Sequence, residues 1–201
     1  MTLPKILGTA FAVPRRSPQT IEFDAWQLRQ FLGLGALEKI CPFAVVTRLS
    51  KVHGETFGVV IRCEPDGHIG IEGWLEIDPP VISLEARVFE DARSGGALGR
   101  DVVLHELAHL LLHASALRTY RNRSLRGGDL KPGKHFTEQS EWQAIRLSSA
   151  FAMPLPMVAA MRSVDALAEA SGMPRKRASY RLGRVVRSDA SDGQQLRLFN
   201  R

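Results

Sequence analysis

Apolar and polar residues alternate with the periods of regular secondary structure along most of this chain. Helical periodicity, helix-starting residues and terminating glycines or prolines mark six helices, and shorter alternating runs rich in Val and Ile mark three strands. The predicted helices cover residues 17–33, 43–52, 100–113, 141–153, 164–171 and 175–187. The predicted strands cover residues 56–62, 69–77 and 81–86. This order predicts an α+β fold in which a small mixed or antiparallel sheet lies beside the helix at 100–113.

The helix at residues 100–113 is strongly apolar, contains neither Pro nor Gly, and carries the sequence His105-Glu106-Leu107-Ala108-His109. Residues four apart lie one turn above each other on a helix, so both imidazoles can reach one metal ion. Glu106 can hold a water molecule beside that ion. Such a motif arises by chance in roughly one chain in a hundred of this composition. The pattern predicts a metallohydrolase site, with a pair of ordinary core or surface histidines as the alternative.

A catalytic zinc ion commonly has three protein ligands, so the motif needs one more. His113 lies a further turn along, but three side chains spaced four apart drift around the helix and cannot all reach one tetrahedral centre. We expect His113 to pack against or support the site. Glu141, near the start of the next helix, is the better candidate, and the alternative is an ordinary acidic residue favoured by the helix dipole. Glu138 is the reserve ligand, and Thr137 or Ser140 is the expected N-cap.

Two segments of the chain resemble the ImmA/IrrE-type metallopeptidases. Residues 100–113, RDVVLHELAHLLLH, look like that family's H-E-L-G-H-L-L-L-H helix. Residues 141–154, EWQAIRLSSAFAMP, resemble its E-x-x-A-N-x-F-A-A-x-L-L-M-P helix. The resemblance covers roughly residues 17–185 and is specific only in these two helices. The chain departs from the family's pattern at three positions: Ala108, Ile145 and Leu147.

The resemblance implies a zincin-like fold, a Zn2+ cofactor held by His105, His109 and Glu141, and Glu106 as the catalytic base. Two imidazoles and one carboxylate also suit zinc on chemical grounds. Zinc lowers the pKa of a bound water molecule toward about 7, and Glu106 can pass a proton from that water to the leaving amine. The family further implies a regulatory endopeptidase that cleaves a helix-turn-helix repressor, often encoded alongside it, and so switches on mobile-element or stress genes.

The connection at residues 118–136 between these two helices is basic and contains glycine. It fits a mobile lid over the cleft and a tolerated surface insertion equally well. Its residues Tyr120, Arg121 and His135 are candidates for the donor that stabilises the oxyanion, and the sequence favours none of them.

The composition predicts an intracellular globular protein. Hydrophobic residues make up 44% of the chain and charged residues 24%, as is typical of soluble domains. Cys41 and Cys63 do not form a C-x-x-C pair, and we expect both to be reduced thiols in the core. Pro4 and Pro14 interrupt the apolar N-terminal run, unlike a signal peptide, and no uncharged run is long enough for a membrane span. These features predict a cytoplasmic protein without membrane contact.

The net charge of +6 comes entirely from residues 173–201, because acidic and basic side chains balance over residues 1–172. The last two predicted helices and their Gly172-Met173-Pro174 turn are spaced as in a helix-turn-helix unit. A basic second helix is what contact with DNA phosphates requires, so nucleic acid is a candidate partner. A solvated basic helix face explains the same charges.

We expect a metallopeptidase core at residues 1–156, a C-terminal helical segment at 157–187 and a flexible tail at 188–201. The alternative to a zinc endopeptidase is a non-catalytic DNA- or protein-binding regulator with a vestigial or structural metal site, including an antitoxin-like partner.

Overall fold

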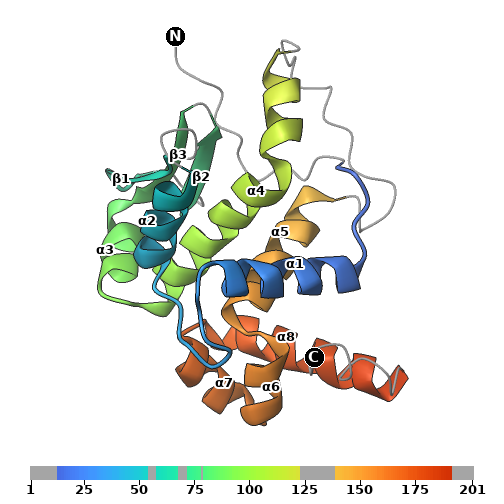
Figure 1. Cartoon of the computed structure of the whole chain (residues 1–201). Coiled ribbons are helices and arrows are strands. Elements are labelled where there is room, and N and C mark those ends of the chain that lie inside the picture. Colours follow the sequence, from blue (N-terminus) through green and yellow to red (C-terminus); the bar gives the residue numbers. More distant parts are fainter. Residues whose placement is uncertain (1–12, 54–57, 68–71, 78, 123–138, 192–201) are drawn as a thin grey trace.

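Figure 1 presents the chain as a computed structural model, which describes residues 13–53, 58–67, 72–77, 79–122 and 139–191. The helices in this part of the chain are α1 (Pro18–Phe31), α2 (Pro42–His53), α3 (Ala86–Arg93), α4 (Ala97–Asn122), α5 (Ser140–Ala152), α6 (Leu155–Ala160), α7 (Val164–Ser171) and α8 (Arg175–Ser191). The strands are β1 (Val60–Glu64), β2 (Gly73–Ile77) and β3 (Pro80–Glu85). None of these helices combines the length and apolar character that crossing a membrane requires.

The three strands form one mixed sheet in the order β1-β3-β2. β3 runs parallel to β1, with Val81 opposite Val60, and antiparallel to β2, with Ile82 opposite Leu75. The central strand is buried along nearly its whole length. Both β2 and β3 contact α4, and the sheet lies beside that helix (Figure 1). The predicted α+β class with a small sheet beside the apolar helix is confirmed.

Two short helices, α3 and α6, were absent from the predicted pattern. Each buries only two apolar side chains, Val88 and Ala92 on α3 and Met157 and Val158 on α6. A single pair of buried positions is too little to establish a helical period in the sequence. The segment after β3 therefore looked like the end of a strand followed by a break.

Helix α4 is longer than predicted at both ends. It begins at Ala97 and continues to Asn122, so the first residues of the predicted 118–136 connection are helical. Residues 118–122 contain neither Pro nor Gly, and nothing in the sequence stops the helix there. Residues 123–136 lie outside the described part of the chain, so neither interpretation of this connection is tested.

Helix α5 packs against both α4 and α1, and most of its side chains are buried. Its N-cap is Gln139, which makes no side-chain capping bond, and Ser140 is the first helical residue. The prediction of Ser140 as the cap is therefore wrong. Ser140 is fully buried by the packing of α5, which local capping signals do not register. Thr137, the other predicted cap, lies outside the described residues.

Arg100, buried at the start of α4, fixes the position of that helix. Its guanidinium donates hydrogen bonds to the carbonyl oxygens of Ile40 and Gly95, both at 2.9 Å, and to that of Gly172. These carbonyls belong to the segment before α2, the turn after α3 and the end of α7. One side chain thus satisfies three backbone acceptors. It joins two distant segments, at Ile40 and Gly172, and the adjacent turn at Gly95 to α4.

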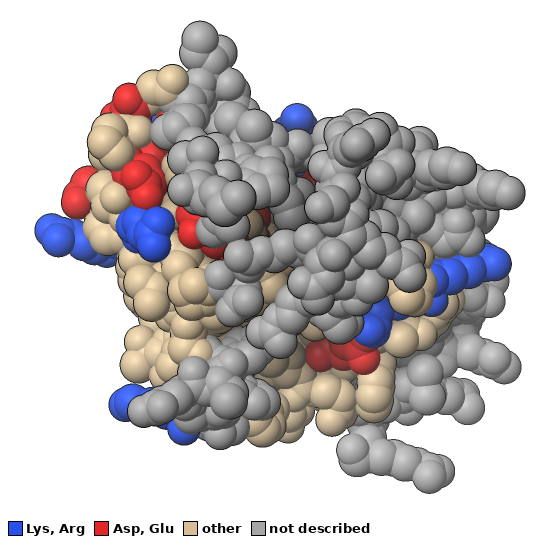
Figure 2. Space-filling view, turned by 90° about the horizontal axis from the view of Figure 1, so that it is seen from above, with Lys and Arg blue, Asp and Glu red and all other residues tan. Residues whose placement is uncertain are grey.

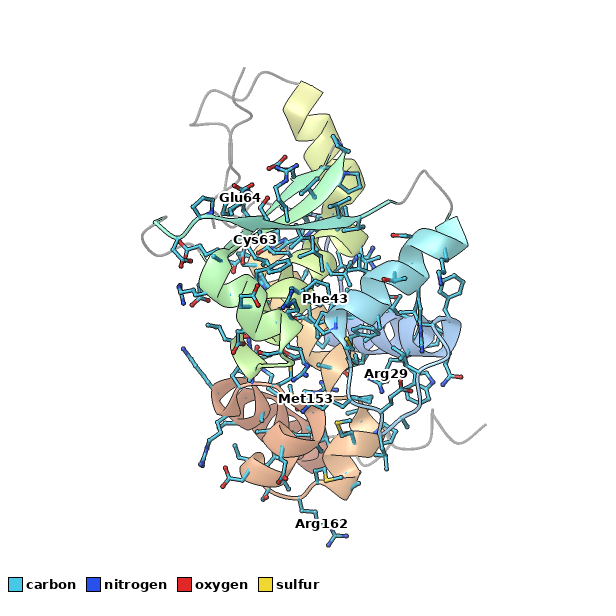
Figure 3. All side chains as sticks on the ribbon, turned by 90° about the vertical axis from the view of Figure 1, so that its left-hand side faces the viewer. Arg29, Phe43, Cys63, Glu64, Met153 and Arg162 are labelled. Carbon is cyan, nitrogen blue, oxygen red and sulfur yellow. The ribbon has the colours of Figure 1, made fainter. Side chains whose placement is uncertain are left out.

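Arg29 and Arg181 make similar buried connections at the end of α5. Arg29 is fully buried and donates to the carbonyl oxygens of Phe151 at 2.7 Å and Glu38 at 2.8 Å. Arg181 on α8 donates to the carbonyl oxygen of Met153 at 2.9 Å. Figure 3 shows Arg29 and Met153 in the interior of the molecule. The end of α5 is therefore held by α1 and α8 together.

Both cysteines are exposed, so the prediction of buried core thiols is wrong. Cys63 lies on β1, an edge strand of the sheet whose side chains are mostly solvent-facing (Figure 3). Cys41 lies in the segment that leads into α2. Cysteine is often buried in proteins, but this is only a tendency of the residue type. Here Cys63 is exposed because it lies on an edge strand, and Cys41 because it lies in a loop.

The C-terminal helix pair agrees closely with its predicted bounds. The Ser163 side chain accepts from the Ala166 amide at the start of α7, and Gly172 ends that helix in the left-handed conformation. α8 starts at Arg175 as predicted and runs four residues beyond the predicted end. Ala178 on α8 is fully buried.

Gly172 and Gly183 form a matched pair for testing the connection through Arg100. Gly172 has a φ of +67°, and a Cβ there would clash with the Arg100 guanidinium, whereas a Cβ at Gly183 in α8 meets nothing within 4 Å. We expect Gly172→Ala to lower the free energy of unfolding by about 1–3 kcal/mol. Gly183→Ala should raise it by about 0.5–1 kcal/mol. Urea denaturation measures both free energies of unfolding. An unchanged value for Gly172→Ala would contradict the structural role of the contact between Arg100 and Gly172.

Candidate metal centre

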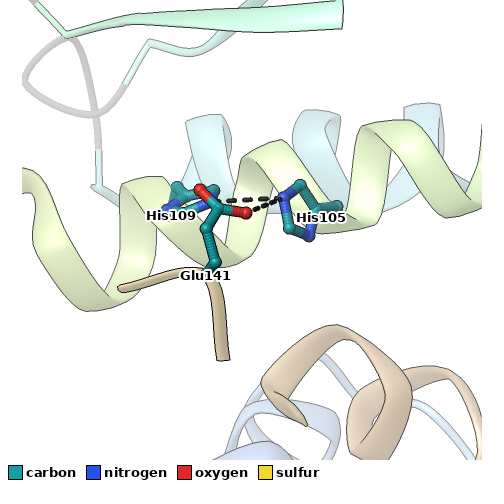
Figure 4. Close-up of side chains that lie close together, drawn as sticks. All are labelled: His105, His109 and Glu141. Atoms are coloured by element: carbon teal, nitrogen blue, oxygen red, sulfur yellow. Dashed lines mark hydrogen bonds and ion pairs between the residues drawn. The ribbon is translucent and has the colours of Figure 1, made fainter. Parts of the chain in front are cut away.

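The candidate metal centre lies where α5 packs against α4. His105 and His109 stand one turn apart on α4, and Glu141 lies in the first turn of α5 (Figure 4). The residues that join the two helices, 123–138, lie outside the described part of the chain. The structure thus brings together the three side chains that the sequence nominated as ligands.

The potential ligand atoms of these side chains converge on one point. His105 Nε2 lies 3.2 Å from His109 Nε2 and 3.2 Å from Glu141 Oε2. His109 Nε2 lies 3.1 Å from Glu141 Oε1. The two imidazole planes are nearly perpendicular, at 86°. Atoms bound to a tetrahedral zinc ion at about 2.0–2.1 Å are about 3.3 Å from one another. Each imidazole nitrogen lies at about this distance from the other and from one oxygen of the Glu141 carboxylate.

The electrostatic environment keeps Glu141 ionised. Burial by itself would raise the pKa of this carboxyl, but hydrogen bonds from His105 and His109 outweigh burial and hold its pKa well below the usual range. Burial likewise would lower the pKa of His105, and the hydrogen bond to Glu141 with the nearby carboxylates raises it overall. A carboxylate and two imidazoles in a half-buried site form an arrangement that favours a cation.

Glu106 lies beside this group, and its carboxyl has a different environment. Burial raises its pKa, the neighbouring His105 and His109 oppose that shift, and the charge of Glu141 adds to it. The side chain is half-buried. The two carboxyl groups of the site therefore have pKa values shifted in opposite directions. In enzymes, such a pair often has different roles, because one carboxyl group stays ionised while the other transfers a proton.

The residues fit a bound divalent cation. Among the described residues, His105, His109 and Glu141 form the group whose possible ligand atoms all lie within 4.8 Å of one another. Without a cation, protons must lie between these nitrogen and oxygen atoms, whereas a metal ion satisfies all three at once. Two nitrogen donors and one carboxylate are a set that zinc accepts readily.

His113 lies outside this group and faces the core. Its Nδ1 lies 3.2 Å from His109 Nδ1, and its Nε2 lies 3.2 Å from Gln143 Oε1. Burial, and then the neighbouring His109, lower the pKa of His113 to about 4. Gln143 is fully buried on α5 and donates a hydrogen bond to the Pro14 carbonyl oxygen at 2.9 Å.

Sequence reasoning missed Gln143, although the chain offered a signal for it. Gln143 stands four residues before Leu147 on α5, and both side chains are buried. A polar residue on the core-facing side of a helix requires a buried partner. That signal indicates a role for Gln143 without naming the partner.

Several other candidates lie where the structure gives no side-chain description. Glu138, the reserve ligand, and His135 are outside the described residues. Tyr120 and Arg121 fall on the last turn of α4, whose side chains are likewise not described. The donor for an oxyanion therefore remains unassigned.

The comparisons with known proteins agree with this geometry. The family model described as the IrrE N-terminal-like domain, peptidase family M78, matches residues 55–182, which include α4 and α5. No curated protein matches the chain. The matched region is well over half of the chain and contains every residue of the candidate centre. The chain therefore belongs to the IrrE N-terminal-like family of peptidases, the ImmA/IrrE family whose two helices it resembles.

Proposed function

We propose that this protein is a zinc-dependent endopeptidase in which His105, His109 and Glu141 hold the ion and Glu106 is the catalytic base. The observation that carries the proposal is the convergence of the three ligand atoms within one half-buried site. Membership of a peptidase family supports hydrolysis of a protein substrate. Zinc, the ligand set and the role of Glu106 rest on the chemistry of the side chains.

Glu106 is suited to move a proton during peptide hydrolysis. A base works best when its pKa lies near the working pH, and burial shifts the pKa of Glu106 upward from its usual value. It follows His105 directly in the chain, so its carboxylate borders the site. Glu106 accepts the proton of the attacking water and delivers it to the leaving amine. The bound ion supplies a Lewis acid that polarises the scissile carbonyl.

The substrate that we propose is a helix-turn-helix transcriptional repressor, cut to switch on mobile-element or stress genes. Family membership supports a protein substrate, and the resemblance of the two site helices supports the narrower class. A repressor of this kind acts in the cytoplasm, and we assign the peptidase to the same compartment. The C-terminal helices are proposed as a helical segment that follows the catalytic core.

The rival function is a DNA- or protein-binding regulator, including an antitoxin-like partner, in which the metal is vestigial or structural. Arg175 and Lys176, exposed at the start of α8, favour it. Arg175 also forms an exposed ion pair with Asp165, at 2.8 Å. Two other basic residues of α8 make less exposed contacts within the chain. Arg177 binds both carboxylate oxygens of Asp101, at 2.9 and 2.8 Å, and Arg181 pairs with Glu22. On the face seen in Figure 2, basic and acidic side chains are interspersed among the described residues.

Metal content tests the ligand set directly. We expect near-stoichiometric zinc in the wild type and in Glu106→Gln, and loss of zinc in Glu141→Ala, because removing one of three ligands opens the site. Glu90→Ala is the matched control, since Glu90 is an exposed helical glutamate on α3. Elemental analysis of protein purified without chelators gives the stoichiometry. Full zinc occupancy in Glu141→Ala would remove Glu141 from the ligand set.

Cleavage tests the role of Glu106. Glu106→Gln should reduce cleavage by at least about 100-fold while zinc content stays unchanged, because the amide cannot accept the proton. The assay incubates each purified protein with the repressor encoded beside its gene and identifies new N-termini by mass spectrometry. The same termini formed at equal rates by both proteins would contradict general-base catalysis by Glu106.

A third experiment separates the peptidase from the DNA-binding rival. Neutralising the exposed pair with Arg175→Gln and Lys176→Gln should leave repressor cleavage unchanged. If α8 contacts phosphates instead, the double variant binds DNA of every sequence more weakly. The slope of log K against the logarithm of the salt concentration then becomes shallower by about two. Fluorescence anisotropy with a labelled duplex at several salt concentrations distinguishes the two outcomes.

A further inference from the structure

A chain of buried contacts runs from the candidate metal centre to the segment before α1. It joins His109, His113, Gln143 and the backbone of Pro14 in that order. His113 and Gln143 are 1% and 0% exposed. Pro14 lies outside the region that matches the family model, residues 55–182, so the end of this chain of contacts is supplied by another part of the protein.

The direction of the contacts can be assigned from the chemistry of the groups. A backbone carbonyl only accepts, so the atom of Gln143 that faces Pro14 is the amide nitrogen, which donates at 2.9 Å. The amide oxygen of Gln143 then faces His113 Nε2 at 3.2 Å. An amide oxygen only accepts, so His113 carries a proton on Nε2.

The same reasoning continues from His113 to His109. A charged imidazolium at the fully buried position of His113 would be costly, and a neutral ring with its proton on Nε2 has a lone pair on Nδ1. That lone pair faces His109 Nδ1 at 3.2 Å. One of two facing nitrogens must donate and the other accept, so His109 keeps a proton on Nδ1. The other nitrogen, Nε2, faces Glu141 at 3.1 Å. Without a metal ion, a proton on Nε2 makes the hydrogen bond to Glu141, and a metal ion would take the place of that proton.

We propose that His113 and Gln143 are positioning residues that confine the proton of His109 to Nδ1 and so reserve Nε2 for the metal ion. The inference rests on the proposed metal site and deepens it. A histidine ligand binds a metal through the nitrogen that lacks a proton, and the hydrogen bond at the other nitrogen selects which one that is. The buried contacts also fix the orientation of the His109 ring.

The second histidine of the site makes a useful contrast. Nδ1 of His105 is buried and has no hydrogen-bond partner among the described residues. The two imidazoles are therefore unequal, because His109 is oriented through Nδ1 and His105 is not. We expect His109 to contribute the more strongly preorganised of the two ligand nitrogens.

A pair of substitutions at one position tests the hydrogen bond separately from packing. His113→Leu removes the acceptor. His113→Asn has the same branched side-chain skeleton as leucine and places an amide oxygen near the position of Nδ1. We expect His113→Leu and Gln143→Met to weaken zinc binding by about 10- to 100-fold, and His113→Asn to recover most of the wild-type affinity. Competition with a chromophoric zinc chelator measures the affinities, and thermal unfolding of each variant shows that it is folded.

Nitrogen-15 NMR of the wild type supplies a readout that does not depend on any variant folding. The histidine ring spectrum of the zinc-loaded protein should show His113 as the neutral tautomer protonated on Nε2. The opposite tautomer, or equal zinc affinity in His113→Leu and His113→Asn, would overturn the inference while leaving the peptidase intact. A wild type that binds no zinc would instead overturn the proposed function, and the His113 tautomer in that protein still decides whether the buried contacts run as assigned.

Discussion

The candidate metal centre depends on holding three possible ligand atoms from two different helices within 4.8 Å of one another. Two of these atoms belong to α4 and one to α5, so the packing of α5 against α4 decides whether a site exists. Packing of apolar surfaces alone is not directional, and small sliding movements would separate the ligands. The buried guanidiniums supply the direction. Arg100 on α4 binds the carbonyl oxygens of Ile40 and Gly95. Arg29 on α1 binds that of Phe151 in α5 and that of Glu38.

The same geometry sets the electrostatics of the two carboxyl groups. Glu141 lies in the first turn of α5, where the helix dipole favours a negative charge, and it receives hydrogen bonds from two imidazoles. Its charge then acts on Glu106, whose pKa burial has already raised. One packing arrangement therefore lowers the pKa of one carboxyl group, Glu141, and contributes to raising that of the other, Glu106. Moving α5 away would abolish both effects together.

Local signals in the sequence were enough for much of the fold and the histidine pair, and tertiary contacts account for the rest. The α7 bounds followed from capping by Ser163 and termination by Gly172, both of which act within a few residues. The histidines were predictable because four-residue spacing on a helix is a local property. Gln143 was missed because its partner, Pro14, lies 129 residues away. The net charge of the C-terminal region also depends on tertiary contacts, since Asp101 and Glu22 neutralise part of it in the folded chain.

The N-terminal segment and α1 extend the site beyond the region that matches the family model. α1 packs along α5, and Arg29 on α1 binds the carbonyl oxygen of Phe151 near the end of that helix. Pro14, just before α1, accepts from Gln143 in the same helix. The two contacts hold α5 near its start, at Gln143, and near its end, at Phe151. A shift of α1 would move Glu141 relative to the histidines even though no residue of α1 touches the metal centre. The matched region therefore contains the proposed ligands, and residues that precede it help to position α5, which carries one of them.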